Sequence, residues 1–170
     1  MFDKNLYNLT LFQGLDHSRI DQIIPLFETC TFSDNVMVFQ QDQAATYFYI
    51  LVAGEIIVKY KPYDGEELLI ARVSPEDIFG WSAALGRSKY TSSAYATVPS
   101  IAIRIQVNHI QQFCEKNPQL GMILLERLAS GIAYRLRSTH DEVLALLTRG
   151  MEFLPEEMRQ SNDSGTSQLS

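Results

Sequence analysis

The spacing of apolar residues changes twice along the chain, which gives it a helical start, an extended middle and a helical end. Apolar positions near the start, among them Ile20 and Ile23, recur at helical spacing after a capping Asp16. After Glu28 the period shortens to two, and from His109 it lengthens again. This pattern predicts a β domain flanked by helices.

The extended middle consists of short apolar runs separated by turn residues. Its clearest strand is Ile101–Val107, where apolar and polar residues alternate strictly. The other predicted strands are Thr29–Phe32, Val36–Phe39, Thr46–Val52, Ile56–Lys61, Leu68–Val73 and Ser92–Val98, with a further strand that ends at Gly80. Repeated short strands with frequent turns predict a mainly β fold, namely a sandwich, a jelly roll or a barrel.

The last third predicts one long helix, because Pro118 suits a first helical turn and no proline occurs from Gln119 to Arg149. A continuous helix of that length spans about 46 Å, more than a small β domain can cover. We therefore expect a homodimer through this helix. The apolar seam falls close to a 3–4 spacing, at Leu125, Leu128, Ile132, Thr139, Val143 and Leu146. The predicted division is residues 1–118 for the β domain, 119–150 for the dimer helix and 151–170 for a polar, disordered tail.

Composition, charge and motif content argue against several classes of function. The 170 residues carry a net charge of −6 with a pI near 5.0, which excludes a generally basic nucleic-acid binder. Two isolated cysteines and three scattered histidines have no metal-ligand spacing, so no metal site is expected. No nucleophile–base motif occurs, so no enzyme activity and no catalytic residue are expected. The N-terminal residues lack the pattern of a signal peptide and no apolar run has membrane-spanning length, so a cytoplasmic location is expected.

The segment that raises the question of function is 76–97, which reads EDIFGWSAALGRSKYTSSAYAT. Its pattern predicts a strand ending at a glycine, a short helix of small residues, a loop and another strand. Backbone amides at such a helix start favour an anion. Arg87 and Lys89 add positive charge, and no Asp or Glu occurs from Ile78 to Thr97. The competing interpretation is a tight strand connection with solvated cations. The candidate ligand-binding residues are Gly80, Trp81, Ser82, Ala83, Ala84, Arg87, Lys89, Tyr90, Thr91 and Ser92.

Several of these motifs resemble one family. The motifs are LFQGLD at 11–16, YILVAGEI at 49–56, DIFG at 77–80 and the long terminal helix. Over roughly residues 8–148 the chain resembles the effector domain of the CRP/FNR family, the cyclic nucleotide-binding domain. The resemblance implies an eight-stranded jelly roll, a phosphate-binding cassette between two of its strands, and a long dimerisation helix. It implies a non-enzymatic regulatory module that senses a small-molecule effector in signal transduction, similar to a transcription regulator.

The resemblance is incomplete at the ligand. The family's cyclic-nucleotide binders carry a Glu where this chain has Trp81, and an Arg where it has Tyr90 or Thr91. Two turn glycines of the family are Asp42 and Glu76 here. Loss of both ligand contacts predicts cAMP binding weaker by about two to four decades. A cyclic nucleotide is therefore possible but not assigned as the ligand, and no cofactor is certain.

Two other functions stay open. A degenerate, ligand-free copy would act as a dimeric interaction scaffold, and a retuned copy would sense a different anion or an aromatic molecule. Full regulators of the family continue into a helix-turn-helix domain. Here about 20 polar, largely acidic residues follow Arg149, so we expect no direct DNA binding by this chain.

Overall fold

The structure is a computed structural model that describes residues 7–152, with side-chain surroundings described through residue 137. The predicted disordered tail falls almost wholly outside the described residues, as do the side chains of Thr139, Val143 and Leu146. The chain divides into two compact units, Met1–Arg135 and Leu136–Ser170. The first unit takes in the opening turns of the long helix, so its limit lies beyond the predicted boundary at residue 118.

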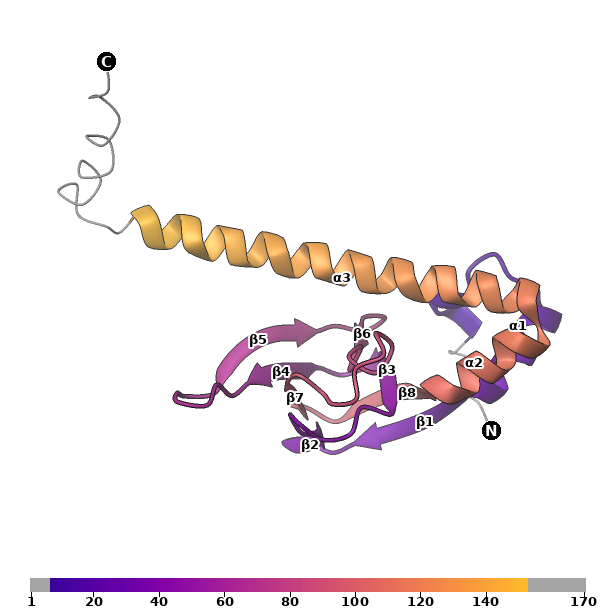
Figure 1. The fold of residues 1–170 in the computed structure, drawn as a ribbon, viewed down its shortest axis with the longest axis horizontal. Helices are drawn as coiled ribbons and strands as arrows, with labels where there is room; N and C mark the ends of the chain where they lie inside the picture. The colour runs from indigo at the N-terminus through magenta and orange to yellow at the C-terminus, as the bar shows by residue number, and fades with distance from the viewer. Residues whose placement is uncertain (1–6, 153–170) are drawn as a thin grey trace, which may run out of the picture. The chain divides into compact units, whose positions relative to one another are not determined.

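The order of elements matches the predicted one, with helices at both ends of a β domain (Figure 1). Before the sheets come η2 (Thr10–Phe12), α1 (His17–Ile23) and η3 (Ile24–Leu26). The strands are β1 (Phe27–Phe32), β2 (Val36–Phe39), β3 (Tyr47–Ala53), β4 (Ile56–Tyr60), β5 (Leu68–Val73), β6 (Ile78–Phe79), β7 (Ser93–Ala96) and β8 (Ser100–Gln106). After them come α2 (Val107–Lys116) and α3 (Pro118–Glu152). The predicted mainly β class is confirmed.

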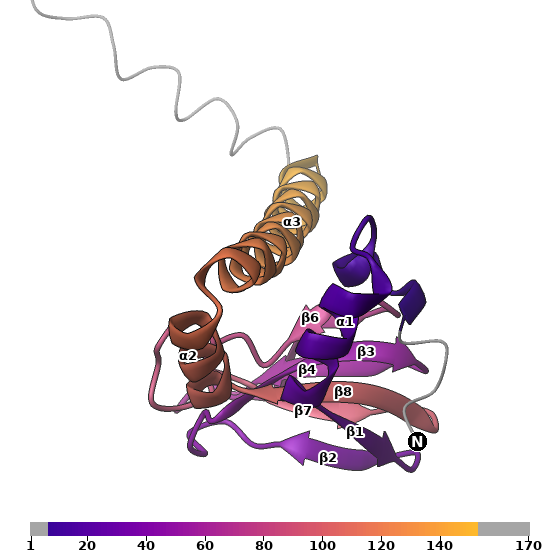
Figure 2. The same cartoon turned by 90° about the vertical axis from the view of Figure 1, so that its right-hand side faces the viewer.

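The strands form two four-stranded sheets, in the orders β1-β8-β3-β6 and β2-β7-β4-β5. Every named strand pair is antiparallel, and Ile103 in the middle of β8 lies opposite Thr29 of β1 and Ile50 of β3. Figure 2 shows the two sheets face to face, with α1, α2 and the first turns of α3 beside the β8-containing sheet. In the part of the chain that is described, no helix is both long enough and apolar enough to cross a membrane.

The β8-containing sheet is buried on both faces, and β3 shows why its sequence is almost wholly apolar. Phe48 and Ile50 point to the helical side, where they join a core with α1, α2 and α3. Tyr49 and Leu51 point between the sheets, where they join the second core. Alternate residues of a strand face opposite sides of its sheet, so a strand inside three layers carries no polar stripe.

Glycines let α3 approach its neighbours closely. A Cβ at Gly121 would lie 2.7 Å from the Cα of Cys114 in α2, and a Cβ at Gly131 would lie 2.9 Å from Cδ1 of Ile78 in β6. These contacts bring Leu128 into the chain's own core, where it is 5% exposed. Leu128 was predicted to lie in the dimer seam, but its apolar side chain is already covered within the chain.

Candidate functional site

The cassette predicted to bind a ligand begins where β6 ends. Gly80 has a φ of +68°, and a Cβ there would lie 3.1 Å from ring atoms of Phe39 and Tyr49, so glycine suits both the backbone and the space. Residues 81–86 form consecutive turns rather than the predicted short helix. The backbone hydrogen bonds do not keep one helical spacing. Leu85 N donates to Trp81 O, four residues back, whereas Arg87 N donates to Ser82 O, five residues back.

The backbone of the cassette leaves several amides open. Among the described residues, the N–H groups of Trp81, Ser82 and Ala84 have no hydrogen-bond acceptor in the protein. The two ends of the loop are held together, because the Ser82 and Thr91 hydroxyl oxygens lie 3.2 Å apart. Open amides on a fixed loop are a feature that an anion can use.

The predicted ligand-binding residues divide into three groups by exposure. Three are exposed and reach solvent, namely Arg87, Lys89 and Thr91. Four are half-buried, namely Trp81, Ser82, Ala84 and Ser92. Three are buried, namely Gly80, Ala83 and Tyr90. The two cations form no ion pair within the described residues, so the predicted positive island is present on the surface.

Tyr90 lies inside the jelly roll and not on the loop surface. Its ring stacks on Phe39 with centroids 3.9 Å apart, in a cluster that also contains Tyr49 and Phe79. Its hydroxyl donates to the Tyr47 carbonyl over 2.5 Å, and its side chain is 3% exposed. Of the two positions predicted to replace the family's Arg, Tyr90 is the one that points inward, and an aromatic ring fills the space between the sheets there.

This burial changes the proton affinity of the cluster. Burial raises the pKa of the Tyr90 hydroxyl above its usual value of 10.0. Burial, and then the neighbouring Tyr90, raise the pKa of Tyr49 as well. In the unfolded chain both hydroxyls titrate near pH 10. Above that pH the unfolded state releases protons that the folded state keeps, so stability is lost as the pH rises.

We therefore expect the free energy of unfolding to fall as the pH is raised from about 9 to 11. Tyr90→Phe keeps the ring and removes one ionisable group, so the variant should show a shallower fall. Urea unfolding of both proteins across this range gives the comparison, because other titrating groups are common to the two. Equal slopes would show that Tyr90 is not shielded from solvent.

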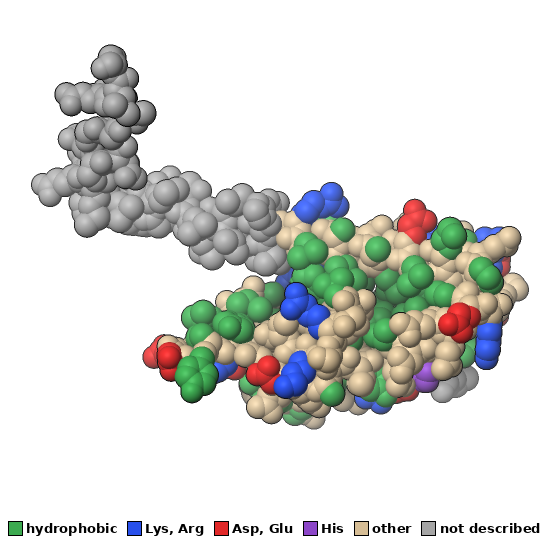
Figure 3. All heavy atoms as spheres, viewed as in Figure 1, with side chains coloured by type: hydrophobic (Ala, Val, Ile, Leu, Met, Phe, Trp, Pro, Cys, Tyr) green, Lys and Arg blue, Asp and Glu red, His purple; other side chains and the backbone are tan. Residues whose placement is uncertain are grey.

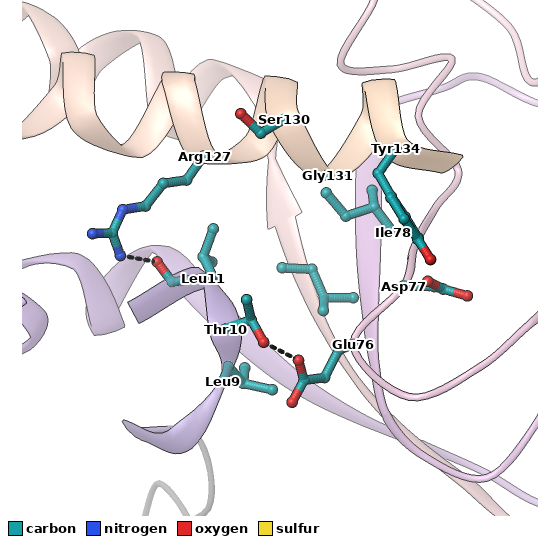
Figure 4. Close-up of a pocket in the computed structure, with 11 residues that line it drawn as sticks. Leu9, Thr10, Leu11, Glu76, Asp77, Ile78, Arg127, Ser130, Gly131 and Tyr134 are labelled. Carbon is teal, nitrogen blue, oxygen red and sulfur yellow. Dashed lines mark hydrogen bonds between the residues drawn. The ribbon is translucent and has the colours of Figure 1, made fainter. Parts of the chain in front are cut away.

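A second hollow was not predicted from the sequence. It has a volume of about 500 Å³ and lies between η2, the turn before β6 and the middle of α3 (Figures 3 and 4). Its polar side chains include Glu76, Asp77, Arg127 and Tyr134. The segments that meet here are far apart in the sequence. The one local signal was Glu76, a departure from the family's glycine, and it has a φ of +74°.

The outer face of α3 carries an apolar stripe. Met122, Leu125 and Leu136 are 70%, 48% and 48% exposed, and they share one helix face with the exposed Ala129. Their spacing is 3, 4 and 7, and the same series continues to the predicted seam residues Thr139, Val143 and Leu146. Ile132 is half-buried against the helical core. The exposed stripe thus contains Ala129 at the place where the predicted seam has Leu128.

An antiparallel jelly roll with a glycine-bounded loop after β6 and a long helix after the strands is the architecture of a class of regulatory ligand-binding domains. The sequence matches the cyclic nucleotide-binding domain over residues 29–117, and the chain belongs to this family. The resemblance predicted from the motifs is confirmed.

Several similar proteins are known by name or by structure. The CRP-like cAMP-activated global transcriptional regulator of Mycobacterium tuberculosis is 24% identical over 145 residues, which is 85% of this chain and 63% of that protein. This chain thus spans less than two thirds of the length of that relative. A putative cyclic nucleotide-binding protein from Geobacter metallireducens has a TM-score of 0.66 and 26% identity, over 80% of this chain and 99% of that chain. The c-di-GMP responsive global regulator CLP of Xanthomonas campestris shares the fold, with a TM-score of 0.67 and 14% identity, over 89% of this chain and 73% of its own.

Proposed function

We propose that the chain is a non-enzymatic regulatory module of the cyclic nucleotide-binding type that signals through a dimer of α3. The observation that carries the proposal is the division of α3 into two apolar faces. One face, with Leu124 and Leu128, belongs to the core of the domain, while the opposite part carries the exposed stripe. A helix that contacts both the ligand-binding domain and a second copy can transmit a change in one to the other.

The aromatic ring of Tyr90 between the two sheets affects which ligand the domain can bind. Tyr90, one of the two residues predicted to stand at the family's Arg position, points between the sheets, and Trp81 stands where the family has Glu. Both departures support cyclic nucleotide binding that is weaker by decades or absent. The ligand-free scaffold is favoured by the same ring. A different anion is favoured by the open amides of Ser82 and Ala84 beside two exposed cations. The relatives named above include one called cAMP-activated and one called c-di-GMP responsive, so the fold supports more than one ligand.

The dimer is tested by charging the stripe. In a double variant, Leu125→Glu with Leu136→Glu, four carboxylates enter the interface of a symmetric dimer. We expect its dissociation constant to rise at least about a hundredfold, because each buried leucine contributes about 1.5–3 kcal/mol. Sedimentation equilibrium at micromolar concentration should give the wild type twice the 19.3 kDa chain mass and the variant the single mass.

Gln119→Glu is the matched control, since it adds a carboxylate to an exposed position of α3 outside the stripe. It should leave the dimer intact, and circular dichroism should show that all three proteins are folded. A wild type of single mass at all concentrations tested would contradict the dimer, and with it the proposed route of signalling.

A further inference from the structure

The hollow between η2, the turn before β6 and α3 has the features of a ligand site, and none of the ten predicted ligand-binding residues lines it. Its volume of about 500 Å³ suits a small molecule. We propose that this pocket binds a small amphipathic amine, with the ammonium group at Glu76 beside Tyr134 and the apolar body on the floor of the pocket.

The anionic end has the groups that recognise an ammonium ion. The Glu76 carboxylate accepts a hydrogen bond from the Thr10 hydroxyl and forms no ion pair among the described residues. Asp77 follows it directly, and Figure 4 shows the Tyr134 side chain reaching from α3 toward the same end. Carboxylates with an aromatic ring attract an organic cation by charge and by the negative face of the ring.

The floor of the pocket is apolar. Leu9 and Ile78 are each 6% exposed and Ile50 is 2% exposed, so the walls behind the polar groups are continuous with the helical core. A hydrocarbon or aryl group placed there is removed from water and packs against apolar side chains. These walls select against small hydrophilic cations, which gain nothing from the floor.

The one cation that lines the pocket is held away from the anionic end. The Arg127 guanidinium donates to the Leu11 carbonyl over 2.6 Å, and in Figure 4 it points to the opposite side from Glu76. Arg135 does not line the pocket, but its guanidinium lies 3.7 Å from Asp77 in an ion pair. Glu76 is therefore the carboxylate of this end that forms no ion pair within the described residues. The potential at the Glu76 end therefore favours a cationic group over a carboxylate.

The position of the pocket connects it to the dimer helix. Arg127, Ser130 and Tyr134 lie on a face of α3 that is distinct from the stripe of Met122 and Leu125. A ligand in the pocket contacts α3 without competing with a partner copy. That this amine is the effector which the domain senses rests on the proposed function, whereas binding of the amine to the pocket does not.

The test uses two probes of similar size and opposite charge, 2-phenylethylamine and phenylacetate. Titration calorimetry on the wild-type chain at pH 7 should show saturable binding of the amine, about tenfold or more tighter than that of the acid. Glu76→Gln keeps the size of the side chain and an acceptor for Thr10, and it should weaken amine binding about tenfold. Glu66→Gln changes another exposed carboxylate, on the connection between β4 and β5, and this variant should bind the amine as the wild type does.

A second variant keeps the test decisive if Glu76→Gln does not fold. Ser130→Phe places a ring over the pocket from an exposed position of α3 and should abolish amine binding. Equal binding of the two probes, or no amine binding up to about 10 mM, would overturn the proposal. The mass of each sample separates the two ideas, since a dimer that binds no amine overturns only this pocket, and a monomer that binds it overturns only the proposed function.

Discussion

Replacing Gly54 by alanine is expected to lower the free energy of unfolding by about 3–5 kcal/mol. Gly54 has a φ of +96°, and a Cβ there would lie 2.2 Å from the Ser100 Oγ and 2.7 Å from the Ser100 Cα. The left-handed backbone costs an alanine about 1–2 kcal/mol, and overpacking against a backbone atom costs about 1–3 kcal/mol. The Ser100 hydroxyl is 2% exposed and accepts from Glu55 N, and displacing it removes that bond as well.

Gly14→Ala is the matched control for this experiment. Gly14 has a φ of +77°, but no atom lies within 4 Å of the position that its Cβ would take. The control therefore keeps the conformational cost of a left-handed alanine and omits the collision, with an expected loss of about 1 kcal/mol. Urea unfolding of the three proteins measures both values. Equal losses in the two variants would show that the contact with Ser100 is not what requires a glycine in the Ala53-Gly54-Glu55 turn.

A gain of cAMP binding is the second large expected effect. The wild type with millimolar cAMP should show no rise in its thermal unfolding temperature, because Tyr90 fills the inward position. The double variant Trp81→Glu with Tyr90→Arg restores the family's pair at the positions where this sequence departs from it. We expect its dissociation constant for cAMP to be lower by about two decades or more, since charged hydrogen bonds contribute about 1.5–3 kcal/mol each.

The unbound variant should itself unfold at a lower temperature than the wild type, because it buries a guanidinium without a partner. Saturating cAMP, at about one hundred times its dissociation constant, adds about 2.7 kcal/mol and should raise that temperature by roughly 5–10 °C. Trp81→Glu with Thr91→Arg is the control, since Thr91 is exposed and should not bring its charge between the sheets. A folded Tyr90→Arg variant without any shift would mean that Tyr90 does not occupy the phosphate position, and a rise in the wild type would mean that the filled barrel still binds cAMP.

The strands could be predicted from the sequence because burial on one or both faces leaves a period of two that short-range rules detect. Val36–Phe39 and Leu68–Val73 have the predicted bounds, and the run predicted from Ile56 ends one residue earlier, at Tyr60. The cassette turns at 81–86 were predicted as a helix because small residues permit a helix without requiring one. The conformation of residues 81–86 depends on the positions of Gly80 and Tyr90, which the rest of the fold determines.

The long helix was predicted at nearly its observed length, but the roles of its faces were not. Leu128 and Leu125 have the same chemistry, and only the position of β6 under Gly131 decides which face of the helix is covered. The pocket could not be predicted, because residues near Leu9, Glu76 and Arg127 meet only after the sheets have formed. A rule based on residue spacing considers one segment at a time and does not detect a site assembled from four segments.

Glu76 shows a compromise between stability and function. A side chain other than glycine in the left-handed region costs the fold about 1–2 kcal/mol, and the family's usual glycine avoids that cost. Folded domains hold a margin of only about 5–15 kcal/mol, so this cost is a substantial part of what is available. A domain selected for robustness alone would carry glycine at this turn. The carboxylate that replaces it lowers the tolerance of this chain to further destabilising substitutions.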